Sequence, residues 1–147
     1  MSDPQIADAA TLAKYLDKVS EIASINKVMG AVYLRDFIIG QDVAGQLVSK
    51  AIQADLRAKA KVDYAKSVAY LDRAADYLVS HKIKDTAEAR KMYVDLDPDV
   101  QAALDNKAKT EALVHLMKNK SSILRQAHDD LKKILYGDNN GTPWEGM

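Results

Sequence analysis

Apolar side chains recur every three or four positions along most of the chain, which is the spacing of one face of an α-helix. Ser2 or Asp3, followed by Pro4, supplies a capping side chain and then a proline in the first turn. These signals predict a first helix that ends at Gly30. Its apolar face consists of Ile6, Ala9, Leu12, Ala13, Leu16, Val19, Ile22 and Ala23.

Residues 31–39, AVYLRDFII, carry a mixed signal. Their β-branched and aromatic side chains suit a strand. A short buried helix fits the same residues, so the pattern leaves both open.

The segment from Gly45 to His81 contains no proline and no further glycine. It predicts a long helix that ends between His81 and Lys84. Many of its apolar positions are alanine, which lets another helix approach closely. These positions are Leu47, Val48, Ala51, Ile52, Ala58, Val62, Ala65, Ala69, Leu71, Ala75 and Leu78.

Two more helices are predicted after this segment. Asp85, with Glu88 three residues later, has the pattern of a reciprocal helix cap. After a break over residues 93–99, Asp97 can cap a last helix that has Pro98 at its first position. That helix would run to Tyr136, with Gly137 as its terminator.

Within the last helix, one set of side chains repeats with the heptad spacing of a coiled coil, either within the chain or between copies. A buried Lys120 in this seam would specify its register. The seam consists of Leu113, Met117, Lys120, Leu124, Ala127, Leu131 and Ile134. We therefore expect an all-α, oligomeric protein with long antiparallel helices, one helical domain over residues 1–137 and a flexible tail over 138–147.

Composition narrows the possible functions. The 147 residues include 21 basic and 21 acidic side chains, so attraction to nucleic acid must come from local arrangement. The absence of cysteine excludes disulfides, thiolate metal sites and cysteine nucleophiles, and fits a reducing cytosol. We expect no signal peptide and no membrane-spanning helix.

A local surplus of positive charge lies between residues 50 and 66, with five basic residues against Asp55 and Asp63. Single-strand binders combine such a surplus with aromatic side chains on which bases stack. The candidate site for single-stranded DNA consists of Lys59, Lys61, Arg57, Lys50, Lys66 and Tyr64, with Tyr70 as a second stacking residue. The alternative is an ordinary solvated helix face in which Asp55 pairs with Lys59 and Asp63 with Lys66.

No enzyme motif is present. His81, His115 and His128 lack metal-ligand spacing, and the sequence from Asp95 onward lacks the glycine and glutamate of a calcium loop. We expect no catalytic site, no metal and no cofactor.

The segment Lys59-Ala60-Lys61-Val62-Asp63-Tyr64 resembles the Lys-Ala-Arg-Leu-Asp-Tyr motif of the UvsY family of phage recombination mediators. Residues 87–134 are similar to that family in pattern, with a short helix, an aspartate-rich turn and a long helix. The chain departs from the family at Lys61, which replaces an arginine that can contact phosphate in two places. It departs also at Ala65, where the family has a second aromatic residue.

The resemblance implies an accessory protein of DNA recombination in the cytoplasm of an infected bacterial host. Its partners would be single-stranded DNA, the recombinase and the single-strand-binding protein, and Lys59 and Lys61 would carry DNA binding. Copies would assemble into a ring of roughly six to eight.

Two alternatives remain. The first is a helical structural or assembly protein of a virion, which the heptad seam favours equally. The second is an adaptor that binds only protein, with Trp144 in the tail as its docking residue.

Overall fold

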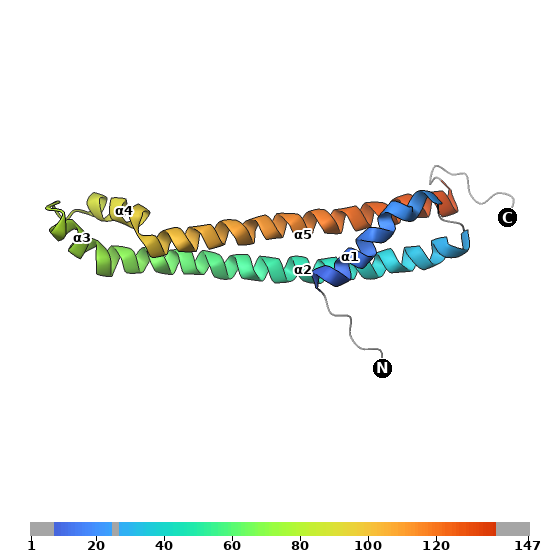
Figure 1. Cartoon of the computed structure of the whole chain (residues 1–147), viewed down its shortest axis with the longest axis horizontal. Helices are drawn as coiled ribbons and strands as arrows, with labels where there is room; N and C mark the ends of the chain where they lie inside the picture. Colours follow the sequence, from blue (N-terminus) through green and yellow to red (C-terminus); the bar gives the residue numbers. More distant parts are fainter. Residues whose placement is uncertain (1–7, 25–26, 138–147) are drawn as a thin grey trace, which may run out of the picture. The chain divides into compact units, whose positions relative to one another are not determined.

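The computed structural model describes residues 8–24 and 27–137, without the side chains of residues 23, 24, 27 and 28. These residues contain no strand, so the all-α prediction is confirmed and residues 31–39 are helical. The elements, in chain order, are α1 (Ala9–Asp17), a 3₁₀ helix (Lys18–Ser24), α2 (Lys27–Val68), a π-helical turn (Ala69–Arg73), α3 (Ala74–Ser80), α4 (Ala87–Leu96) and α5 (Pro98–Tyr136) (Figure 1).

The chain divides into two compact units. The first unit comprises Met1–Lys50 and His115–Met147, and the second comprises Ala51–Val114. Helices α2 and α5 contribute residues to both units. The expectation of one domain over residues 1–137 stays a prediction.

In the first unit, α2 and α5 run antiparallel. Gly30 on α2 lies against Leu135 on α5, whereas Gly40, further along α2, lies near Leu124, earlier on α5. Between Met117 and Leu131, buried side chains follow one another seven residues apart on α5, as the heptad pattern predicts. Coiled-coil-like packing is therefore present within the chain.

The ends of the predicted seam are not buried within the chain. Leu113 and Ile134 are exposed, while their neighbours Val114 and Leu135 are buried and half-buried. Each residue along a helix adds about 100° of rotation, so a shift of one position turns a side chain out of the seam.

Gly30 does not end a helix, contrary to the sequence prediction. Helix α2 continues through Gly30, Gly40 and Gly45. A Cβ atom at Gly40 would lie 2.8 Å from the Cβ of Tyr15 on α1. Glycine at this position is thus a requirement of close helix packing, which outweighs its poor helix propensity.

The second unit is built around small side chains. Its buried apolar residues are mostly alanine and valine. They comprise Ala51, Ala58, Val62, Ala69, Ala74, Leu78, Val94, Val100 and Val114.

Helix ends agree closely with the capping signals. The Asp97 carboxylate caps α5 by accepting hydrogen bonds from the N–H of Asp99, at 3.0 Å, and from the N–H of Val100, at 3.2 Å. Pro98 occupies the first helical position, where its missing N–H costs nothing.

Helix α5 ends at Tyr136, and Gly137 follows with a φ of 77°. This left-handed conformation is the one that glycine commonly adopts just after a helix. Both predictions are confirmed.

Other ends differ from the expectation or lie outside the description. The cap of α4 is Thr86, which accepts from the N–H of Ala89, and not Asp85. Helix α1 is capped by Asp8. The start predicted at Ser2 or Asp3, and the tail over 138–147 with Trp144, lie outside the described residues.

Candidate nucleic-acid interface

All six residues of the predicted DNA site are exposed and helical on α2. Tyr64 is 73% exposed, which is unusual for an aromatic side chain. Lys50 belongs to the first unit, whereas the other five belong to the second. The candidate interface is therefore confined to residues 57–66.

The buried residues Ala58 and Val62 divide these five side chains into two sets. At about 100° per residue, Arg57, Lys61 and Tyr64 lie within roughly 60° of one another on one flank. Lys59 and Lys66 lie on the opposite flank. We call these the Arg57 strip (Arg57, Lys61, Tyr64) and the Lys59 strip (Lys59, Lys66).

This division separates the two basic residues of the resemblance motif. Both belong to the continuous helix α2. Two positions along a helix correspond to about 160° of separation around its axis, so Lys59 and Lys61 project on either side of the buried stripe. One nucleic-acid strand that follows α2 can contact one strip along its length, but it cannot lie flat on both.

Within residues 8–24 and 27–137, no acidic side chain forms an ion pair with either strip. Asp55 instead contacts Lys107 Nζ at 2.9 Å and Thr110 Oγ1 at 2.7 Å, both on α5. The hydrogen bond to Asp55 raises the pKa of Lys107, so this lysine stays charged. In the described part of the chain, no ion pair joins Asp55 to Lys59 or Asp63 to Lys66, and the ordinary pairing proposed as the alternative is not formed.

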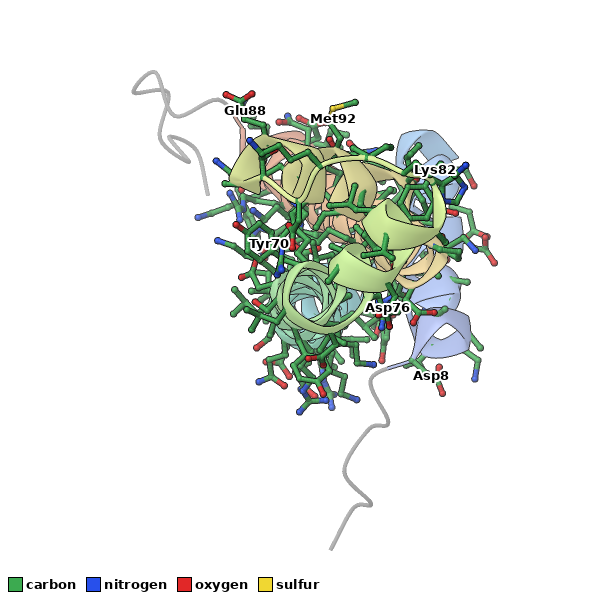
Figure 2. All side chains as sticks on the ribbon, turned by 90° about the vertical axis from the view of Figure 1, so that its left-hand side faces the viewer. Asp8, Tyr70, Asp76, Lys82, Glu88 and Met92 are labelled. Carbon is green, nitrogen blue, oxygen red and sulfur yellow. The ribbon has the colours of Figure 1, made fainter. Side chains whose placement is uncertain are left out.

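The Lys59 strip leads into a hollow of about 610 Å³ between the end of α2 and α4. Lys66 and Ser67 line it on one side, and Lys91 and Asp95 on the other. Figure 2 shows Tyr70 between these two helices, while Met92 extends outward from α4. Sequence reasoning missed Lys91, because only the fold brings α4 to α2.

The π-helical turn at Ala69–Arg73 shapes this hollow. Ala74 donates its N–H to the carbonyl of Ala69, five residues back, so the ordinary pattern of hydrogen bonds four residues apart is interrupted.

Arg90 on α4 donates from Nη1 to the carbonyl oxygen of Tyr70 at 3.1 Å. The Arg90 guanidinium also makes two hydrogen bonds to Asp85, at 2.7 and 2.8 Å, and these lower the pKa of that carboxyl.

A buried cluster around Asp97 fixes where α4 ends and α5 begins. Arg73 contacts both carboxylate oxygens of Asp97 at 2.8 Å, and the Tyr93 hydroxyl donates to Oδ2 at 2.7 Å. Asp97 is fully buried. Chiefly because of Arg73, the pKa of Asp97 lies well below its usual range, so the residue remains a carboxylate. The cluster is structural, since the carboxylate of Asp97 is fully used in hydrogen bonds within the fold.

The first unit has a smaller basic hollow of about 330 Å³. Lys118 and Arg125 line it on α5, together with Ser121, and Gly45 lines it on α2. A Cβ atom at Gly45 would meet nothing within 4 Å, so this position is open. Sequence reasoning did not select these residues, because only the fold brings Gly45 on α2 to the three residues on α5.

Among residues 8–24 and 27–137, no group of three histidine, aspartate or glutamate side chains could hold a metal ion. Over the same residues, no helix is both long and apolar enough to cross a membrane.

Comparison with known proteins adds no assignment. No protein-family model, curated protein or solved structure matches the chain.

Proposed function

We propose that the chain binds single-stranded DNA through the Arg57 strip. The observation that carries this proposal is the exposure of Arg57, Lys61 and Tyr64 along one side of α2, with no ion pair to either cation within the described residues. Phosphate contacts by cations supply most of the affinity in nonspecific binding. An exposed aromatic ring beside them supplies a platform for an unstacked base.

The Arg57 strip is favoured over the Lys59 strip because it includes Tyr64. Arg57 also presents two parallel N–H donors to a phosphate, as a lysine cannot. Lys59 and Lys66 would then contribute longer-range attraction, which is sensitive to salt.

The resemblance of residues 59–64 to the UvsY family supports a narrower role. In that role the protein would help load a recombinase onto single-stranded DNA and weaken the hold of the single-strand-binding protein. A ring of copies would repeat a weak site many times, so that avidity would compensate for the few cations of each protomer.

The test is fluorescence anisotropy of a labelled oligonucleotide, with Arg57→Ala and Lys61→Ala combined. We expect the affinity to fall by about tenfold, since two phosphate contacts are removed. The matched control combines Lys84→Ala and Lys109→Ala, two exposed lysines of the same unit that lie outside both strips. The proposal is wrong if the two double variants lose the same affinity, or if wild type does not bind.

A second variant separates stacking from charge. Tyr64→Ala should weaken single-strand binding by about 1–3 kcal/mol, whereas Tyr64→Phe should retain it. Double-stranded DNA of the same sequence should respond to neither change, because its bases are not free to stack on the ring.

A second candidate function, a helical assembly protein, is favoured by a different observation. Leu116, Ile123 and Ile134 on α5 are each at least 40% exposed. Absence of DNA binding, together with recovery of the protein from purified particles, would favour this candidate.

A further inference from the structure

Helix α5 carries a second apolar stripe in the first unit, beside the buried seam. The stripe consists of Leu116, Ile123 and Ile134, all on this one helix. Their spacings of 7 and 11 residues place them within about 20° of one another around the axis. Their side chains are 47%, 40% and 58% exposed. Apolar residues that line up at coiled-coil spacing and remain exposed mark a surface that another helix can cover.

The order of residues along this stripe is self-complementary about position 125. Leu116 and Ile134 lie nine residues on either side of it, and Ile123 and Ala127 lie two residues on either side. Lys120 and Asp130, of opposite charge, lie five residues on either side. An antiparallel copy of the same helix, centred at position 125, would therefore place Leu116 against Ile134, and Lys120 against Asp130, twice.

These pairings fit the geometry of an antiparallel coiled coil. From Leu116 to Ile134 the stripe positions are 116, 120, 123, 127, 130 and 134, which alternate steps of four and three. In an antiparallel coiled coil with this repeat, a residue at core position a of one helix packs beside a residue at core position d of the partner helix. Ala127 is only 3% exposed within its own chain. Its short side chain therefore leaves room for Ile123 of the other copy.

The charges of Lys120 and Asp130 favour a second copy of the chain over this stripe, in antiparallel orientation. Lys120 is half-buried and forms no ion pair in the described residues, and Asp130 is also half-buried and accepts only from Gln126 Nε2, at 2.8 Å. A parallel copy would place Lys120 beside Lys120 and Asp130 beside Asp130, which repel. An antiparallel copy places each opposite its counterion.

We propose that this stripe of α5 is a two-fold interface at which two copies of the chain pair antiparallel, with Lys120 of each copy opposite Asp130 of the other. Such a contact joins a surface to itself and closes at two copies, so it does not by itself generate a ring. It is independent of DNA binding, which uses the other unit.

The test is a charge swap measured by sedimentation equilibrium of the full chain. Lys120→Asp and Asp130→Lys should each weaken dimerisation by roughly 10- to 30-fold, because two attractive pairs become repulsive. The double variant that exchanges the two residues should restore the wild-type value. The control Lys118→Asp reverses an exposed charge on another side of α5 and should leave dimerisation unchanged.

A cross-linking experiment determines whether the two α5 helices run antiparallel, without depending on the charge substitutions. The chain has no cysteine, so each introduced thiol is the only one present. A mixture of Leu116→Cys and Ile134→Cys chains should form a mixed disulfide, whereas Leu116→Cys alone should not, since its two thiols would be roughly 27 Å apart. Disulfides of Leu116→Cys alone, a monomeric wild type, or a charge swap that fails to restore dimerisation would each overturn the proposal.

Discussion

The two units use different means to hold their helices together. In the first unit, side chains fit closely at glycine positions, as where Gly40 meets Tyr15 and Leu124. In the second unit, small apolar residues form the core and charged groups fix the helix ends, through Arg73 with Asp97 and Arg90 with Asp85. Added side-chain volume should therefore destabilise the first unit, whereas removal of a charged group should destabilise the second.

The largest effect is expected from Asp97→Ala. The change removes two hydrogen bonds to Arg73, one from Tyr93 and the cap of α5. We expect a loss of about 2–4 kcal/mol in the free energy of unfolding, somewhat less than for a fully buried pair because Arg73 can rehydrate. Urea denaturation followed by circular dichroism measures it.

Asp99→Ala is the control for this change. Asp99 also lies near Arg73, at 3.5 Å, but its side chain is 75% exposed. Its loss should cost less than about 0.5 kcal/mol. Equal costs for the two variants would contradict the assigned role of Asp97.

The next effect is expected from Gly40→Ala in the first unit. The added methyl group would lie 2.8 Å from the Cβ of Tyr15, so α1 must shift. Such overpacking costs about 1–3 kcal/mol. Hydrogen exchange should show faster exchange in α1 and in residues 117–131, with smaller changes in residues 69–100. Faster exchange confined to residues 69–100 would refute the packing role.

Gly45→Ala is the matched control, because both positions are glycines inside α2. Nothing lies within 4 Å of a Cβ atom at Gly45. Alanine there should stabilise the helix by about 0.5–1 kcal/mol. In urea denaturation, the free energy of unfolding should thus fall for Gly40→Ala and rise for Gly45→Ala. Destabilisation at both would show that α2 needs flexibility and not space.

Acid should weaken the second unit through Asp97 and Asp85. Contacts with arginine lower the pKa of both carboxyl groups in the folded state. Their stabilising contribution is complete above the unfolded pKa of about 4 and is lost as pH falls through the lower folded values. Unfolding free energies measured between pH 7 and pH 3 should fall below about pH 4, and Asp97→Asn should flatten that fall. An equal fall in this variant would assign the effect to other groups.

A stabilisation comparable with that at Gly45 is expected from Lys82→Gly, at the end of α3. Lys82 has a φ of 56°, and the next residue, Ile83, donates its N–H to the carbonyl of Leu78 at 2.8 Å. This left-handed conformation after a helix favours glycine. Glycine should therefore stabilise the chain by about 1 kcal/mol. A rise in the midpoint of thermal unfolding checks this, and a fall would mean that the lysine side chain contributes more than the strain costs.

The sequence predicted the helices well because their periods and caps are local signals. Asp97 with Pro98, and Gly137 after Tyr136, lie at the ends where the pattern placed them. The helix end predicted at Gly30 is wrong, because glycine can end a helix but also permits close packing inside one. Only the contact with Leu135, far along the chain, distinguishes the two cases.

The candidate site was only partly predictable for a similar reason. That residues 57–66 form one helical segment follows from their sequence, and so does the separation of Lys59 from Lys61 around it. The partner of Asp55 does not, since Lys107 lies 52 residues away and reaches it only in the folded unit. The same holds for Lys91, which lines the same hollow as Lys66.

The most direct test of the proposed function is the dependence of oligonucleotide affinity on salt concentration. Each phosphate contact to a single strand contributes about 0.7 to the slope of log affinity against log salt. The Arg57→Ala, Lys61→Ala double variant should therefore have a slope shallower than wild type by about 1.4, with the Lys84→Ala, Lys109→Ala control unchanged. Identical slopes for wild type and the Arg57 strip variant would contradict the claim that these two cations contact the strand.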